Sequence, residues 1–272
     1  SLMEKTNILV VFDPTREVQP ALDRAASIAA LLPCTLHVFC CIHNDIPRSK
    51  DRAATVKRQL QEQRELVERA IEQLDTGDAE VTVQLEWEQD WYGAVVRASI
   101  SRNVDVVLKS TYRHTTGQRV LNRTSDWTLI RECLCPVLLV REGSNGELQK
   151  VLAAIDIRAK TDSYQRINQR IIDFSHRVLD QEDAEVHFIN AFRELKEVPD
   201  RNELVKACGI DGSRIHLRMG EPDEVIVQSA REMNAGLVVV GNSARSGLAA
   251  VMRGNTVEKV LDKLACDVLS LP

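Results

Sequence analysis

The stretch "NILVVFD" (7–13) decides the fold, because the chain repeats it as "KVLAAID" (150–156). Each is a continuous apolar run closed by an aspartate, which is typical of a strand buried on both faces of a parallel sheet. Two more pairs follow in the same order: "DVVLKS" (105–110) with "LVVVGN" (237–242), and "CPVLLV" (135–140) with "CDVLSL" (266–271). This long period indicates a duplicated domain, because solenoid repeats have periods of roughly 20 to 50 residues.

The duplication predicts two domains, 3–140 and 148–272, joined by the polar, turn-forming segment "REGSNGE" (141–147). In both copies apolar runs alternate with segments of helical periodicity. This alternation predicts the α/β class, with helices on both faces of a parallel sheet. Five strands in each copy predict two tandem Rossmann-like or flavodoxin-like domains, whose ligand crevices lie outside the carboxyl ends of the strands.

Composition excludes several classes of function. The net charge of −5 argues against a general nucleic-acid-binding role, which needs clustered Lys and Arg. No apolar segment approaches the roughly 20 residues of a membrane span, and no secretory leader opens the chain, so we expect a cytoplasmic protein without membrane insertion. The first two residues, before Met3, are interpreted as a cloning remnant.

The cysteines and the missing motifs narrow the chemistry further. Seven cysteines, mostly in or beside apolar runs, indicate buried free thiols. The pair in Cys133-Leu-Cys135 has no second pair at zinc-site spacing, so no metal site is predicted. The chain also lacks GxxxxGK[ST], GxGxxG, GxSxG and HExxH, and no catalytic residue is predicted.

Four features together resemble the universal stress protein family: the strand-end aspartates, Gly241 after an apolar strand, the loop returning at Gly254, and the closing "CDVLSL". The duplicated form resembles tandem members of that family. The resemblance implies an intramolecular pseudo-dimer and a non-enzymatic, cytoplasmic role in stress resistance. In nucleotide-binding members the loop pattern is Gly, two residues, Gly, nine residues, Gly, then Ser or Thr.

The second copy keeps this pattern in part. Gly241 and Gly254 match the first and third glycines, Ala244 replaces the second, and Asn255 replaces the Ser or Thr. The resemblance implies an adenine-nucleotide site, with ATP and magnesium as cofactor, at Asp156, Val240, Gly241, Ala244, Gly254, Asn255 and Thr256. Asn255 and Glu258 also fit a capping box at the start of a helix, and the two interpretations are compatible.

The first copy departs further from the pattern. Aligned back from the final strand of this copy, Lys109 falls at the position of Gly241 and Arg123-Thr124 at Gly254-Asn255, with one extra residue in the loop. Asp13 is expected to cap a helix or brace a loop. The loop is locally basic, which favours either an anion site or a solvated surface loop. The candidate residues are Asp13, Lys109, Arg113, Arg119, Arg123 and Thr124.

The functional hypothesis is a tandem stress protein with an adenine nucleotide or another small ligand in its second domain, and with self-association or protein partners. One alternative is a protein-interaction or small-ligand regulator without nucleotide, and another is a weak ATP hydrolase. The dispersed histidines do not favour catalysis, because none is partnered with a nucleophile in the sequence. His37 and His187 fall at equivalent places, which favours a structural role.

Overall fold

The computed structural model describes residues 5–112, 126–144, 150–155, 166, 169–170, 172–173, 184–243, 246–247 and 260–272. The chain divides into two compact units. The first unit comprises Ser1–Arg113 and Glu132–Gly143, and the second comprises His114–Arg131 and Ser144–Pro272. The predicted domain boundaries, 3–140 and 148–272, remain predictions.

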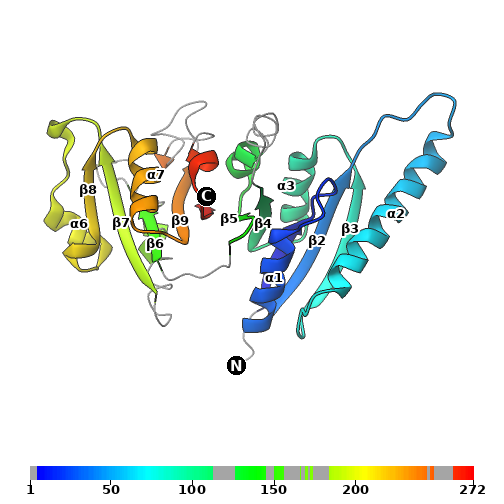
Figure 1. The fold of residues 1–272 in the computed structure, drawn as a ribbon, viewed down its shortest axis with the longest axis horizontal. Coiled ribbons are helices and arrows are strands. Elements are labelled where there is room, and N and C mark those ends of the chain that lie inside the picture. Colours follow the sequence, from blue (N-terminus) through cyan, green and yellow to red (C-terminus); the bar gives the residue numbers. More distant parts are fainter. Residues whose placement is uncertain are drawn as a thin grey trace. The chain divides into compact units, whose positions relative to one another are not determined.

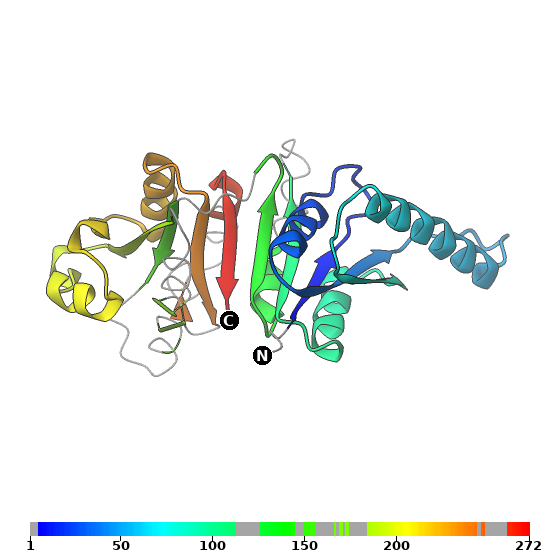
Figure 2. The same ribbon diagram turned by 90° about the horizontal axis from the view of Figure 1, so that it is seen from below.

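The first unit contains a sheet of five parallel strands in the order β3-β2-β1-β4-β5 (Figure 1). These strands are β1 (Thr6–Val11), β2 (Cys34–Ile42), β3 (Glu80–Trp87), β4 (Val106–Thr111) and β5 (Val137–Arg141). The helices between them are α1 (Pro20–Leu31), α2 (Arg52–Glu72) and α3 (Trp91–Ser101). Figure 2 shows α1 and α2 on one face of this sheet and α3 on the other.

Local sequence sets where these helices begin. Pro20 occupies the first turn of α1, where its missing N–H removes no helical hydrogen bond. The Asp51 side chain accepts the N–H of Ala54 at 3.2 Å and caps α2, and Asp90 caps α3 by accepting the N–H of Gly93 at 3.2 Å. The core lies between the sheet and the helices α1 and α2, and it includes Ile8, Val10, Leu22, Leu36, Val38 and Val67.

The second unit repeats the architecture with a sheet in the order β8-β7-β6-β9-β11, again with every neighbouring pair parallel. Its strands are β6 (Lys150–Ala154), β7 (Glu185–Phe192), β8 (Ile215–Met219), β9 (Leu237–Ser243) and β11 (Asp267–Leu271). The helices α6 (Arg201–Cys208) and α7 (Pro222–Glu232) lie on opposite faces (Figure 2). Two short 3₁₀ helices, Leu195–Glu197 and Gly212–Arg214, also belong to this unit.

Both sheets confirm the predicted five parallel strands with helices on both faces. Numbered within each unit, their order is 3-2-1-4-5, which is the Rossmann order rather than the flavodoxin order 2-1-3-4-5. The order reverses between β1 and β4 in the first unit, and between β6 and β9 in the second. The ligand crevice of such a sheet lies at the carboxyl ends of these two strands.

Candidate functional site

The strand register determines which residues of the two crevices are equivalent. Ser110 pairs with Val140, the last residue of "CPVLLV". Gly241 pairs with Leu271, the last residue of "CDVLSL". Ser110 is therefore the equivalent of Gly241, and the predicted equivalence of Lys109 and Gly241 is wrong by one residue. The reason is physical: a one-residue shift keeps two apolar runs aligned while it turns each side chain to the opposite face.

Two asparagines support this corrected register. Asn103 and Asn234 follow α3 and α7 and have φ of 51° and 53°, the left-handed conformation that often ends a helix. Ser110 follows Asn103 by seven positions, as Gly241 follows Asn234. In this register Arg123 follows Ser110 by 13 positions, as Gly254 follows Gly241, so the predicted extra loop residue is not there.

In the first unit, the loop after β1 is held closed by its own side chains. Asp13 accepts both the N–H of Thr15, at 2.8 Å, and the hydroxyl of Thr15, at 2.6 Å. The buried amide of Gln19 accepts the N–H of Asp13 and donates to the carbonyl oxygens of Asp13 and Arg16. Asp13 thus braces the loop, while the residue at the N-cap position of α1 is Gln19.

Tyr112, directly after β4, ties the same loop to the sheet. Its hydroxyl donates to the carbonyl oxygen of Val18 at 2.8 Å, and the guanidinium of Arg16 lies 4.6 Å from the centre of its ring. Burial, and then the Asp13 carboxylate, raise the pKa of Tyr112 to about 12, so the phenol remains a donor at neutral pH. In the first unit, the loop after β1 is therefore tied to the end of β4 by the chain's own contacts.

Lys109 points away from the start of α1. Its ammonium lies 5.3 Å from the centre of the Trp91 ring, at the start of α3, and donates to the carbonyl oxygen of Ser110 at 2.9 Å. The hydroxyl of Ser110 instead accepts the N–H of Ala21 in α1, as expected for successive residues of a strand. Four other candidates lie outside the described residues: Arg113, Arg119, Arg123 and Thr124.

In the second unit the structure describes Val240 and Gly241, both buried at the end of β9. Five further candidates lie outside the described residues: Asp156, Ala244, Gly254, Asn255 and Thr256. The short strand β10 (Ser246–Gly247) pairs antiparallel with β9 and was not predicted. The candidate nucleotide loop therefore begins with a return along β9.

Asn190 is a further crevice residue, which the sequence analysis missed. It lies on β7, is 1% exposed, and donates from Nδ2 to the carbonyl oxygen of Ile155 at 3.1 Å. Its buried Oδ1 has no hydrogen-bond partner in the part of the chain that the structure describes. Its equivalent in the first unit is the fully buried Cys40. An asparagine inside the apolar run "VHFINAF" was the available signal.

Comparison with known proteins places this arrangement in a family. The model of the universal stress protein family matches residues 5–141 and 175–272. The chain belongs to the universal stress protein family. Two matched segments make it a tandem universal stress protein, which confirms the resemblance found in the sequence. Membership supports a role in the stress response.

Relatives share the tandem arrangement over nearly their whole length. Universal stress protein E of Photorhabdus laumondii is 28% identical, over 97% of this chain and 94% of that protein. A Pseudomonas aeruginosa UCBPP-PA14 structure assigned to the universal stress proteins is 25% identical, with TM-score 0.67, and the match covers 98% and 93% of the two chains. A universal stress protein of Archaeoglobus fulgidus, 16% identical with TM-score 0.72, covers 97% of this chain and shares the fold.

The strand-two histidines of this universal stress protein occupy equivalent positions, as predicted. His37 pairs in register with Leu9, and His187 with Leu152. His37 contacts the Asn7 side chain at 2.6 Å and the Thr82 hydroxyl at 2.7 Å. These contacts bridge three strands of the sheet, and they support the structural role expected for this residue.

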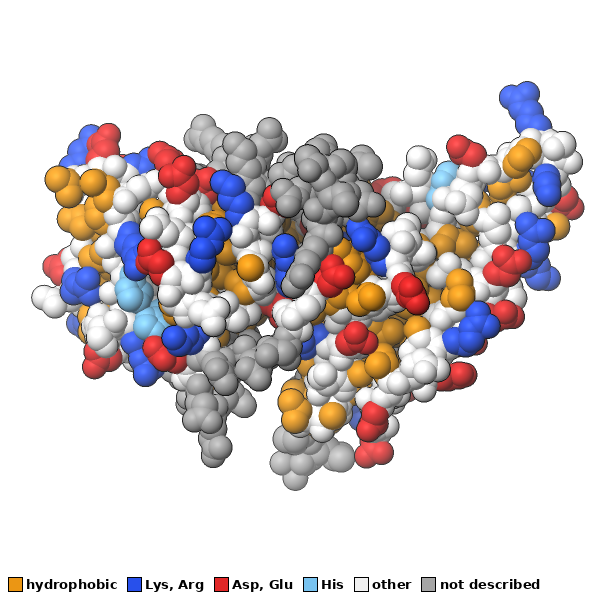
Figure 3. Space-filling model, viewed as in Figure 1, with side chains coloured by type: hydrophobic (Ala, Val, Ile, Leu, Met, Phe, Trp, Pro, Cys, Tyr) orange, Lys and Arg blue, Asp and Glu red, His pale blue; other side chains and the backbone are white. Residues whose placement is uncertain are grey.

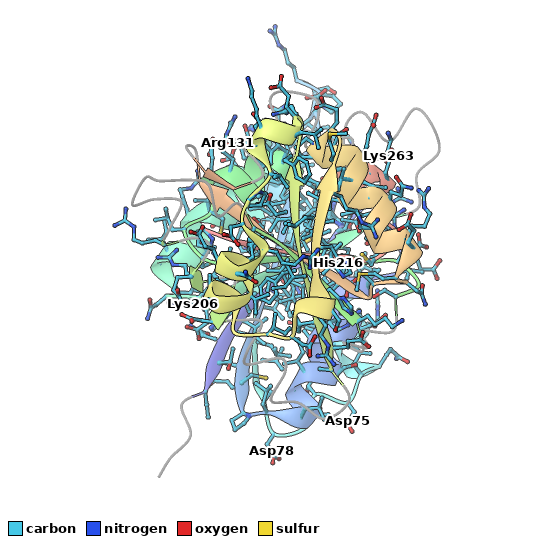
Figure 4. The ribbon with its side chains drawn as sticks, turned by 90° about the vertical axis from the view of Figure 1, so that its left-hand side faces the viewer. Asp75, Asp78, Arg131, Lys206, His216 and Lys263 are labelled. Carbon is cyan, nitrogen blue, oxygen red and sulfur yellow. The ribbon has the colours of Figure 1, made fainter. Side chains whose placement is uncertain are left out.

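His187 takes part in a different cluster. Its ring nitrogens lie 2.8 Å from His216 Nε2 and 2.5 Å from a Glu185 carboxylate oxygen. His216, labelled in Figure 4, lies on β8, the edge strand of the second unit. Figure 3 shows histidine side chains at the surface of this unit among Lys and Arg side chains. Among the described residues, no group of three or more His, Cys, Asp or Glu side chains is arranged to hold a metal ion.

The remaining predictions concern thiols and membranes. All seven cysteines of the universal stress protein are free, and Cys34, Cys40, Cys133 and Cys208 are buried. Within the described ranges, no helix combines the length and the apolar character needed to cross a membrane.

Proposed function

We propose that this tandem universal stress protein is a non-enzymatic regulator that binds one adenine nucleotide, ATP with magnesium, in its second unit. The first unit binds no nucleotide in the family manner. The observation that carries the proposal is the difference between the two crevices: side chains brace the first, whereas the second has glycine at the end of β9 and a buried acceptor without a partner.

The absence of a side chain at Gly241 allows a ligand to approach the backbone at the end of β9. Ser110 carries a hydroxyl at the equivalent place, and that hydroxyl is already engaged by α1. The same comparison pairs Asn190 with Cys40. At these two positions the second unit therefore has the smaller residue on β9 and the more polar residue on β7.

Asn190 supplies a contact suited to an adenine base. Its amide is held by the carbonyl oxygen of Ile155, the residue before Asp156. A buried acceptor without a partner is costly, and a ligand donor such as an exocyclic amino group removes that cost. We assign the Oδ1 of Asn190 this role, beside Asp156, which the family pattern associates with the base or ribose.

The phosphates are assigned to the returning end of the loop. The sequence predicts a helix that begins at Asn255, and backbone amides at a helix start are good phosphate donors, so we assign the phosphates to Gly254, Asn255 and Thr256. Ala244 replaces a glycine of the family pattern. Its methyl group hinders the approach of a ligand to the backbone only slightly, because the side chain is small. Val240 is buried in the core, directly before Gly241.

Titration calorimetry of the whole chain with ATP and magnesium, combined with a phosphate-release assay, tests this function. We expect saturable heat and no phosphate release above the protein-free rate. The absence of heat at millimolar nucleotide would overturn nucleotide binding and favour a regulator that acts through another small ligand or a protein partner. Magnesium-dependent release of phosphate that the Gly241 variant below abolishes would overturn the non-enzymatic assignment.

Two reciprocal variants locate the site. Gly241→Ser gives the second unit the residue of the first, and we expect about a tenfold weaker nucleotide affinity, or about 1.4 kcal/mol. Ser110→Gly makes the opposite change and is the matched control. It should leave the affinity unchanged and create no second site, because Tyr112 and Gln19 still hold the loop.

A further inference from the structure

Cys133-Leu-Cys135 brings two sulfur atoms together at the start of β5. The Sγ atoms of Cys133 and Cys135 lie 3.5 Å apart. Cys133 is 3% exposed and Cys135 is half-buried, whereas the side chain between them, Leu134, is 74% exposed. The chain bends here, between the helical residues 126–132 and β5, so that the leucine points outward and the two thiols remain together.

The spacing suits a bond between these sulfur atoms. Residues two apart have Cα atoms at most about 7 Å apart even in a fully extended chain. Disulfides need a Cα separation of roughly 4.4 to 6.8 Å and an S–S length of about 2.0 Å. A bend shortens the Cα separation of two such residues into the range that disulfides need. Bringing the two Sγ atoms from 3.5 Å to bonding distance therefore requires side-chain rotation rather than movement of a distant segment.

The pair is also chemically unequal. A hydrogen bond from the Cys135 thiol, followed by one from the backbone of Cys135, lowers the pKa of Cys133 to about 6. The same hydrogen bond, together with burial, raises the pKa of Cys135. The shared hydrogen bond therefore favours the thiolate form at Cys133 and the thiol form at Cys135.

Four of the other thiols differ from this pair. Burial raises the pKa of Cys40 and of Cys208 to about 12, and it also raises the pKa of Cys34. Cys41 is half-buried like Cys135, but burial and then Glu86 raise its pKa to about 12. Cys41 is therefore the matched internal reference for an accessible but unreactive cysteine.

We propose that Cys133 and Cys135 form a reversible disulfide on contact with a hydroperoxide, which makes this segment an oxidative modification site. The Cys133 thiolate attacks the peroxide, an S–O bond forms, the O–O bond breaks, and the alkoxide or hydroxide leaves and takes a proton. Cys135 then attacks the sulfenic sulfur, an S–S bond forms, and the S–O bond breaks with release of water. Two thiols and one hydroperoxide give one disulfide, one alcohol or water, and one water.

A single tryptic peptide reports this reaction. Cleavage after Arg131 and Arg141 gives "ECLCPVLLVR" (132–141), which contains both cysteines and no other. The reduced, full-length protein is treated with hydrogen peroxide, alkylated and digested. We expect this peptide to lose both alkylation sites together, with a mass two hydrogen atoms lower, and to regain them after dithiothreitol. The loss of these alkylation sites should be on the order of 100-fold faster than the loss of the site at Cys41. The larger thiolate fraction of Cys133 outweighs the lower intrinsic nucleophilicity that accompanies its lower pKa.

Two variants separate the steps. Cys135→Ser should leave Cys133 as a sulfenic acid that a 1,3-diketone traps, and Cys133→Ser should slow oxidation of Cys135 to the rate seen at Cys41. In the unmodified chain the rate should fall as pH drops below about 6, where Cys133 becomes protonated. Oxidation no faster than at Cys41, or a peptide that gains oxygen without losing two hydrogens, would overturn the proposal.

Discussion

The hydroxyl of Tyr112 donates a hydrogen bond to the carbonyl oxygen of Val18 at 2.8 Å, which joins the end of β4 to the loop that follows β1. In a Rossmann sheet these two segments border the ligand crevice. In the first unit this hydrogen bond holds the loop after β1 against the end of β4. The second unit has the sequence equivalents of the strands but a serine, Ser243, at the position of Tyr112.

Tyr112→Phe tests how much this hydrogen bond contributes to stability. The variant removes the hydroxyl that donates to the carbonyl oxygen of Val18, a residue that is 52% exposed, so we expect a loss of about 0.5 to 1.5 kcal/mol in the free energy of unfolding of the first unit. Urea denaturation followed by tryptophan fluorescence measures it, since Trp87 and Trp91 lie in the first unit. Tyr92→Phe is the control, because the Tyr92 ring packs edge-on against Trp91 and lies outside this loop. Equal stability of Tyr112→Phe and the parent chain would contradict the brace.

Asn190 and Cys40 lie at equivalent positions, so each can be replaced by the residue of the other unit. Asn190→Cys removes the buried acceptor, and we expect about tenfold weaker binding of ATP, with little loss or even a gain in the stability of the nucleotide-free chain. Thermal unfolding with and without ATP measures both effects. Cys40→Asn places an amide at the equivalent position of the first unit. We expect this variant to be less stable than the parent and to bind ATP with unchanged affinity. If Asn190→Cys binds ATP as the parent does, Asn190 is not a ligand contact.

The histidine cluster of the second unit predicts a pH dependence of stability. Burial lowers the pKa of His216, and the charges of His187, Arg218 and Arg201 act in the same direction. The unfolded chain therefore takes up a proton more readily than the folded one, and stability is lost as pH falls below about 6.5. His216→Gln introduces the residue found at the equivalent position, Gln84.

We expect the stability of His216→Gln to change less between pH 7 and pH 5, as measured by urea denaturation at each pH. His43→Gln, at an exposed position beside Trp87, is the control and should retain the slope of the parent. An unchanged slope in His216→Gln would show that other groups, such as His37, account for the pH dependence.

The basic loop of the first copy remains a predicted anion site. Replacing Arg113, Arg119 and Arg123 with glutamine should weaken binding of a phosphate-bearing polyanion and reduce its dependence on salt concentration. Fluorescence anisotropy with a labelled oligonucleotide at two salt concentrations measures both. Unchanged affinity and salt dependence would favour a solvated surface loop.

The sequence predicted the features that depend on patterning. Continuous apolar runs such as "NILVVF" predicted buried parallel strands, and their repetition predicted two sheets of five strands. The equivalence of His37 and His187 followed from the same alignment. These features depend only on the periodicity and order of apolar residues, which the sequence itself contains.

The pattern of apolar residues did not predict the strand register or the side-chain contacts. The misplacement of Lys109 arose because "DVVLKS" and "LVVVGN" remain apolar in either alignment, and only strand pairing distinguishes them. Aligning Asn103 with Asn234 gives the correct register, because both adopt the left-handed conformation before a strand. The Tyr112 brace joins residues 94 positions apart, and no local pattern encodes that contact.

The number of ATP molecules bound per chain tests the central claim most directly. Equilibrium dialysis of the full chain against ATP and magnesium, with protein concentration determined by amino-acid analysis, gives this number. We predict one nucleotide per chain, reduced in apparent affinity by Gly241→Ser and unaffected by Ser110→Gly. Two nucleotides per chain, none, or one that survives Gly241→Ser with full affinity would contradict the account.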